Sequence, residues 1–212
     1  TKGVPSQAAS NVLKGFKPEY ESTVTAKLFE AGAVMLGKLN MDEFAMGSSN
    51  ETSAYGNAVS PWRRKGSNVQ LTPGGSSGGS AVAVAAGMGP LSVATDAGAS
   101  TRLPAACCGI LGLKPTLGRV PHNQVPDAFN SFIHLGLMAR TVEDCELMLE
   151  AIAGPHPYDP YSLVSENLRS QTLRVEWRPL LGNTLLDDEV RSECEAALRD
   201  LGVEIRTVDE PF

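Results

Sequence analysis

A run of four glycines and three serines, Pro73-Gly74-Gly75-Ser76-Ser77-Gly78-Gly79-Ser80, most constrains what this chain can fold into. It stands directly before an Ala/Val-rich segment, residues 80–86, that is typical of a buried helix. Glycine tolerates positive φ and close backbone approach, and a helix start points unpaired N–H groups toward the preceding loop. The run therefore predicts a tight loop at a helix N-terminus, which either shapes a turn or builds a site.

Two chemistries that use such a loop lack their partner residues here. A phosphate-binding P-loop requires a lysine after its second glycine, where this chain has Ser80. A Ser-His-Asp hydrolase would use Ser76 within the pattern G-x-S-x-G, and it needs a histidine base ordered by a carboxylate. The chain has three histidines, His122, His134 and His156. The sequence identifies no acidic partner for any of them.

A third chemistry is amide hydrolysis without histidine. A lysine kept neutral by burial can take the proton of a serine nucleophile through a second serine. A small-residue turn over residues 95–102 contains Ser100 and follows an expected strand at 91–94. Consecutive backbone N–H groups in such a turn can point at one atom, as an oxyanion hole requires. Taken alone, each of the two segments is equally compatible with a structural turn.

Alternating helix and strand patterns predict the α/β class, with a mixed, largely parallel sheet flanked by helices. We expect a single domain over residues 1–212, with a surface connection or sub-domain boundary in the polar, proline-containing stretch 156–171. A capping box, Thr141 with Asp144, predicts one helix start. The other expected elements are helices at 22–31, 80–86 and 187–201 and strands at 34–36, 91–94, 173–175 and 203–205.

Composition argues against several functional classes. A net charge of −6 gives no footprint for direct nucleic-acid binding, and we interpret Arg63-Arg64-Lys65 as a solvated loop. No apolar run reaches the about 18 residues of a membrane span, and no signal peptide opens the sequence, so we expect the cytoplasm or an organelle matrix. Four cysteines without C-x-x-C spacing predict neither disulfides nor zinc, and we expect no metal or cofactor.

Three blocks in this order resemble the amidase signature family: residues 73–80, 94–104 and 109–116. A fourth block, residues 37–49, is similar to the tRNA-dependent amidotransferase branch of that family. The resemblance covers essentially the whole chain and is most specific over residues 31–120. It implies the amidase signature fold, here incomplete, and cleavage of a carboxamide to carboxylate and ammonia.

The resemblance also implies a role for each loop residue. Ser100 would be the nucleophile, Ser76 the proton relay after a cis peptide bond, and Ser77 their support. The other implied residues are the oxyanion-hole backbone at Ala97, Gly98, Ala99 and Ser100, the loop-supporting pair Asp96 and Arg102, and the loop glycines Gly74, Gly75, Gly78 and Gly79.

The chain departs from the family pattern in three ways. The base lysine belongs to a strand expected a few residues before Thr1, so it lies outside this sequence, and neither Lys38 nor Lys114 matches it. Ala99 stands where the family usually has glycine, and a positive φ there would cost about 1 kcal/mol or more. The family's C-terminal half is also outside the sequence. We therefore expect either a fragment or a degenerate member, inactive alone.

The preferred hypothesis is an amidohydrolase with an acyl-enzyme on Ser100. Its more specific form is the glutaminase component of a tRNA-dependent amidotransferase, which passes ammonia to a partner subunit; any ATP would bind to that partner. One alternative is a stand-alone aliphatic or aryl amidase, favoured by the stretch 133–163. A second alternative is a non-catalytic fragment without the base lysine, and a third is a Ser-His-Asp hydrolase that uses Ser76.

Overall fold

The chain divides into two compact units. The computed structural model describes residues 1–122, 132–162, 175–179 and 185–208, and the units are Thr1–Ser165 and Glu166–Phe212. The division falls inside the stretch 156–171, where the sequence indicates a surface connection or sub-domain boundary. Within the described ranges no helix is long and apolar enough to cross a membrane.

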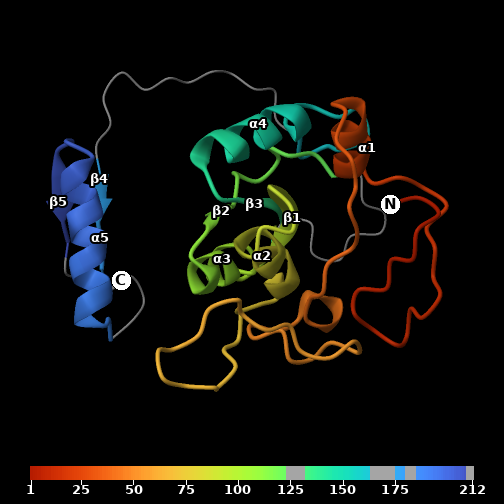
Figure 1. Cartoon of the computed structure of the whole chain (residues 1–212). Coiled ribbons are helices and arrows are strands. Elements are labelled where there is room, and N and C mark those ends of the chain that lie inside the picture. Colours follow the sequence, from red (N-terminus) through yellow and green to blue (C-terminus); the bar gives the residue numbers. More distant parts are fainter. Residues whose placement is uncertain (123–131, 163–174, 180–184, 209–212) are drawn as a thin grey trace. The chain divides into compact units, whose positions relative to one another are not determined.

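The first unit is built on a three-stranded sheet with strand order β1-β3-β2 (Figure 1). Its strands are β1 (Leu91–Asp96), β2 (Leu111–Leu113) and β3 (His134–Ala139). Both pairings with β3 are antiparallel, and the register places Asp96 opposite His134. The end of β1 at Asp96 is therefore fixed by a paired neighbour.

The predicted α/β class is confirmed, but the expectation of a largely parallel sheet is wrong for these three strands. β1 and β2 run in the same direction and are joined through helix α3 (Arg102–Cys108), as in a parallel crossover. β3 lies between them and runs the opposite way. A strand-helix-strand pattern in the sequence predicts that the two strands run in the same direction. It does not predict that a third strand is inserted between them in the sheet.

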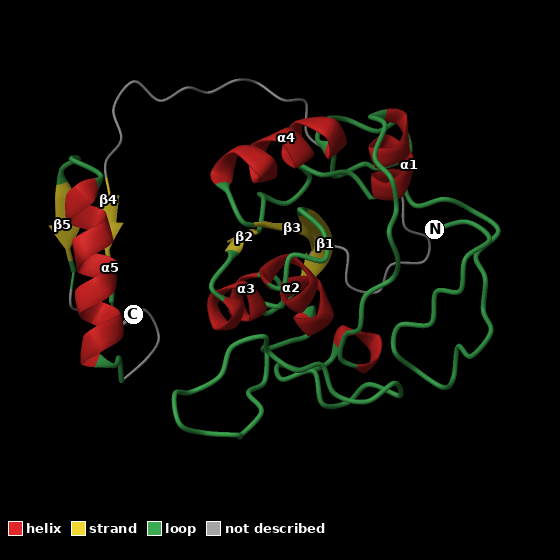
Figure 2. Cartoon of the chain, viewed as in Figure 1, coloured by secondary structure: helices red, strands yellow, loops and turns green. Residues whose placement is uncertain are grey.

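Helices cover both faces of this sheet (Figure 2). α2 (Gly78–Ala85) and α3 pack against one face, and α4 (Val142–Ile152) packs against the other. α1 (Thr23–Glu30) packs on α4. A short 3-10 helix, η1 (Glu43–Ala45), lies between α1 and α2 in the sequence. The loop before α2 is thus placed on the α2 and α3 side of the sheet.

Strand β3 divides the core of this unit into two clusters, because successive side chains of a strand point to opposite faces. Leu137 and Ala139 pack with α1 and α4, whereas Met138 packs with α2 and α3. The buried members of the first cluster are Val24, Val120, Leu137, Ala139, Cys145, Met148 and Ile152, and those of the second are Ala81, Val84, Ala94, Cys108 and Met138.

The local signals for helix ends were accurate, whereas some burial predictions were not. Thr141 caps α4 by accepting a hydrogen bond from Asp144 N at 3.1 Å, as the capping box predicts. The apolar spacing in this helix predicts an inward stripe of Val142, Cys145, Leu149 and Ile152. Val142 does not belong to it, because it is 62% exposed. The expected buried strand at 34–36 is also wrong, since the segment is irregular and Val34 is 81% exposed. Three apolar residues alone do not specify a pairing partner.

The second unit contains the parallel pair β4 (Val175–Trp177) and β5 (Ile205–Thr207) together with α5 (Asp188–Asp200). These elements confirm the predicted helix at 187–201. The strand expected at 203–205 is found at 205–207, and of the strand expected at 173–175 only Val175, the first residue of β4, lies within the described ranges. The apolar spacing predicts an inward face made of Val190, Cys194, Ala197, Leu198 and Leu201. None of these residues is buried, and Val190 is 52% and the C-cap Leu201 56% exposed. A short unit has little interior in which to bury a helix face.

A tight contact between β3 and the start of α3 gives the first prediction. A Cβ added at Gly136 would lie 2.0 Å from Oγ1 of the buried Thr101. We expect Gly136→Ala to lower the free energy of unfolding by about 1–3 kcal/mol through overpacking. Urea unfolding measures this, with Gly37→Ala as control because nothing lies within 4 Å of that position. Equal stability of the two variants would contradict the prediction.

Candidate functional site

The glycine-serine loop, residues 73–80, is completely buried and leads directly into α2 at Gly78. The peptide bond between Gly75 and Ser76 is cis, at the position that the resemblance implies. Gly74 has φ of 77°, which a residue with a side chain rarely adopts. The loop therefore has an unusual backbone that is closed in on all sides by the fold.

Three loop glycines are required by packing, because neighbouring chain lies where a side chain would be. The neighbours come from residues 40–50, well before the loop in the sequence. An added Cβ would lie 2.1 Å from Asp42 Oδ2 at Gly75, 2.5 Å from Asn50 Oδ1 at Gly78 and 2.4 Å from Asn40 O at Gly79.

The second loop begins at Asp96, whose fully buried carboxylate organises it. The carboxylate accepts hydrogen bonds from Ala99 N at 2.9 Å, Thr101 N at 3.2 Å and Arg102 N at 3.4 Å. It also accepts two from the Arg102 guanidinium, from Nε at 3.0 Å and Nη2 at 2.9 Å. Asp96 and Arg102, for which the resemblance implies a supporting role, are thus bonded to each other and to the backbone of the loop.

Electrostatics keep Asp96 ionised. Burial by itself would raise the pKa of this carboxyl, but hydrogen bonds from Arg102 and from the backbone of Ala99 and Thr101 outweigh it and lower the pKa to about 2. The hydrogen bond to Asp96 in turn raises the pKa of Arg102. The loop is thus held by a permanently charged pair over the physiological pH range.

The two loops meet through Ser77. Its backbone N–H donates to Ser100 O at 3.3 Å, and its hydroxyl lies 3.3 Å from Thr95 N and 3.4 Å from Thr95 O. Ser76 is fully buried, and its Oγ has no hydrogen-bond partner among the described residues. Ser100 is half-buried. The fold therefore joins the segments carrying the two predicted serines and leaves a hydroxyl uncommitted beside their junction.

One predicted oxyanion-hole donor requires correction. The N–H of Ala99 is already donated to Asp96 Oδ1, so Ala99 supports the loop and does not present a free donor. Ala97 and Gly98 are exposed, and neither their N–H groups nor that of Ser100 donate to another residue within the described ranges. These three N–H groups therefore remain as proposed oxyanion donors.

The backbone at Ala99 adopts φ of 87°. The sequence predicts strain at this position if φ is positive, and the structure meets that condition. Alanine in this region carries a steric penalty of about 1–2 kcal/mol relative to an unstrained backbone. The hydrogen bond from Ala99 N to Asp96 compensates part of that penalty.

Asp42 is a second buried carboxylate, and no sequence pattern indicates its role. Its oxygens accept hydrogen bonds from Asn50 N at 2.9 Å, Glu51 N at 3.1 Å and Thr52 N at 3.3 Å, and its own N–H donates to Ser76 O at 3.0 Å. Asp42 therefore holds the 50–52 turn against the cis peptide. No local pattern signals this, because the contact with Ser76 spans 34 positions.

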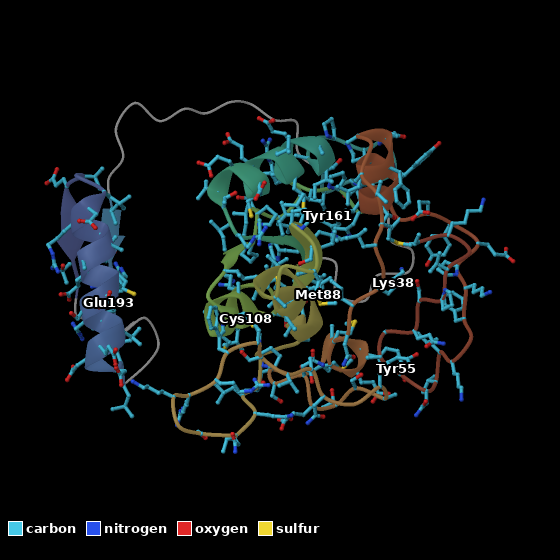
Figure 3. All side chains as sticks on the ribbon, in the orientation of Figure 1. Lys38, Tyr55, Met88, Cys108, Tyr161 and Glu193 are labelled. Carbon is cyan, nitrogen blue, oxygen red and sulfur yellow. The ribbon has the colours of Figure 1, made fainter. Side chains whose placement is uncertain are left out.

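The remaining candidates lie elsewhere. Lys38, labelled in Figure 3, donates to Ser6 Oγ at 2.8 Å, and Lys114 donates to Pro115 O. Neither is bonded to Ser76 Oγ. His134 Nδ1 lies 3.3 Å from Asp96 O, a carbonyl, and no described histidine bonds to Ser76 Oγ. The Ser-His-Asp alternative therefore gains no support.

Comparison with known proteins identifies the family. The amidase family model matches residues 1–211. The chain belongs to the amidase family. Over its whole length it is 51% identical to the A subunit of the glutamyl-tRNA(Gln) amidotransferase from Dinoroseobacter shibae, of which it covers 45%. The chain thus spans about half the length of the curated relatives that it matches.

Solved amidase structures share the fold. The A subunit of the Thermotoga maritima glutamyl-tRNA(Gln) amidotransferase superposes with a TM-score of 0.84 and 32% identity, over 98% of this chain and 47% of that one. A bacterial aryl acylamidase of the amidase signature family gives a TM-score of 0.86 and 27% identity, over 99% of this chain and 45% of that one. The amidase signature fold predicted from the sequence is confirmed.

The strain at Ala99 gives a second prediction. We expect Ala99→Gly to raise the free energy of unfolding by about 1 kcal/mol, because glycine adopts φ of 87° without steric penalty and only part of this gain is lost to the unfolded chain. Chemical denaturation measures it. Ala97→Gly, in the same loop without a positive φ, is the control, and equal effects of both substitutions would contradict the prediction.

The low pKa of Asp96 gives a third prediction. A depressed pKa stabilises the fold above the ordinary value of 3.8, and this stabilisation is lost as the pH falls toward 2. We expect Asp96→Asn to be less stable than the native chain by about 2 kcal/mol at pH 6. The difference in the free energy of unfolding between the native chain and Asp96→Asn, measured by urea unfolding, should become smaller as the pH falls below 4. A difference that does not change with pH would show that the charge of Asp96 contributes nothing.

Proposed function

We propose that this chain forms the nucleophile-bearing part of an amidohydrolase, with Ser100 as the nucleophile and Ser76 as the proton relay. The observation that carries the proposal is the junction of the two loops. Ser77 N–H bonds to Ser100 O, while the buried Ser76 Oγ next to it keeps its hydroxyl uncommitted. A proton relay is one role that leaves a buried hydroxyl without a structural partner.

The proposed reaction proceeds through an acyl-enzyme. Ser100 Oγ attacks the amide carbonyl carbon as its proton passes to Ser76 and from there to the lysine base, which the resemblance places outside the 212 residues. The N–H groups of Ala97, Gly98 and Ser100 stabilise the oxyanion. Collapse of the tetrahedral species breaks the C–N bond, and the returning proton leaves with ammonia. Water then hydrolyses the ester on Ser100 to the carboxylate.

The more specific proposal is a glutaminase that supplies ammonia to a partner subunit of a tRNA-dependent amidotransferase. It is supported by relatives at 51–62% identity that are named as the A subunit of glutamyl-tRNA(Gln) amidotransferase. A stand-alone amidase is the second candidate, and it is supported by the equally good superposition of an aryl acylamidase. The two differ in substrate and in dependence on partner subunits.

A hybrid enzyme tests these alternatives. Residues 1–212 replace the matching segment of the Dinoroseobacter shibae A subunit, which supplies the remaining half, and the hybrid is expressed with and without that enzyme's partner subunits. Ammonia release from glutamine that increases with the partners supports the glutaminase. Faster release from aryl or aliphatic amides without partners supports the stand-alone amidase. A folded hybrid that releases ammonia from neither class supports the non-catalytic alternative.

The nucleophile assignment gives a fourth prediction. We expect Ser100→Ala to reduce kcat of the hybrid by at least about 10³-fold, with no residual acyl-enzyme, because the attacking hydroxyl is removed. Mass spectrometry after reaction with a fluorophosphonate checks it directly by locating the modified serine. Ser192→Ala, at an exposed serine of α5 in the second unit, is the control. Modification of Ser76 that persists in the Ser100→Ala variant would transfer the nucleophile role to Ser76.

A further inference from the structure

Asn50 is a fully buried polar residue beside the glycine-serine loop. Its backbone is left-handed, with φ of 59°. Neither the nitrogen nor the oxygen of its side-chain amide has a hydrogen-bond partner among the described residues. The amide therefore makes no polar contribution to the part of the fold that the structure describes, although burying it removes it from water.

Asn50 contacts the loop from two directions. Its amide oxygen lies against Gly78, the first residue of α2, so closely that a Cβ there would be 2.5 Å away. Its backbone N–H donates to Asp42 Oδ2 at 2.9 Å, and that same oxygen lies against Gly75. Ser76 and Ser77 lie between these two contacts in the sequence. Asn50 thus bounds the segment that carries the proposed relay.

A purely backbone role does not account for this side chain. Asparagine is one of the residues that tolerate left-handed backbone, but glycine tolerates it better. Glycine would also avoid burying an amide that has no partner among the described residues. The amide therefore has a role apart from the left-handed backbone conformation. The contact that it makes is with Gly78, in the first turn of α2.

We propose that Asn50 is a positioning residue for Ser76. Its amide packs beneath Gly78, fixes the start of α2, and so holds the Ser76–Ser77 backbone where the relay needs it. Asn50 acts through Gly78 and does not touch the substrate. The consequence for turnover rests on the proposed function, whereas the consequence for the loop does not.

The test compares Asn50→Gly, which keeps the left-handed backbone and removes the amide, with Asn57→Gly, an exposed asparagine in the following loop. In the hybrid enzyme, Asn50→Gly should lower kcat by about tenfold and leave KM within about twofold, since a misplaced relay slows chemistry more than binding. Asn57→Gly should change neither. If kcat is equally unaffected in both variants, the proposal is overturned.

Hydrogen exchange on the 212-residue chain provides a readout independent of activity. The reporters are the N–H groups of Ser77, bonded to Ser100 O, and Gly79, bonded to Asn40 O. Asn50→Gly should accelerate both by about tenfold relative to Asn57→Gly. If the exchange rates of these two N–H groups do not change in Asn50→Gly, the proposal that Asn50 acts through Gly78 is overturned, whatever the effect on kcat. Accelerated exchange in a chain whose native hybrid releases no ammonia supports the positioning role and contradicts the proposed function.

Discussion

The hydrogen bonds of the Asp96 carboxylate are the interaction on which the candidate site depends. Asp96 ends β1 on the face covered by α2 and α3, and it receives three backbone N–H groups and the guanidinium of Arg102. Because its charge is buried, these bonds are stronger than they would be in water. They fold residues 97–102 back on the strand end and hold the positive φ of Ala99.

Asp42 has the corresponding position under the other loop. Its carboxylate orders the 50–52 turn, and its backbone N–H holds Ser76 O. The glycines of the loop are needed because Asp42 and Asn50 occupy the space that their side chains would take. One acidic residue thus supports each serine-bearing loop, and Ser77 joins the loops. The proposed chemistry requires this arrangement, since relay and nucleophile come from segments 24 positions apart.

Much of the local structure could be predicted from the sequence. The capping box at Thr141, the apolar periodicity of α1 and the glycine-serine run before α2 rest on contacts within a few residues. The expected strand at 34–36 was wrong because pairing depends on a partner that three apolar residues do not specify. β3 between β1 and β2 was missed for the same reason, and with it the antiparallel register that places His134 opposite Asp96.

The sequence by itself therefore determined the amidase family, the α/β class and the two serine-bearing segments, because these depend on composition and on short patterns in a fixed order. Only the tertiary structure decided that Ser76 Oγ is buried and uncommitted among the described residues, that Ala99 N belongs to Asp96, and that Asp42 and Asn50 enclose the loop. Each of these facts depends on which backbone atoms meet. Contacts between distant segments arise from packing and leave no trace in local spacing.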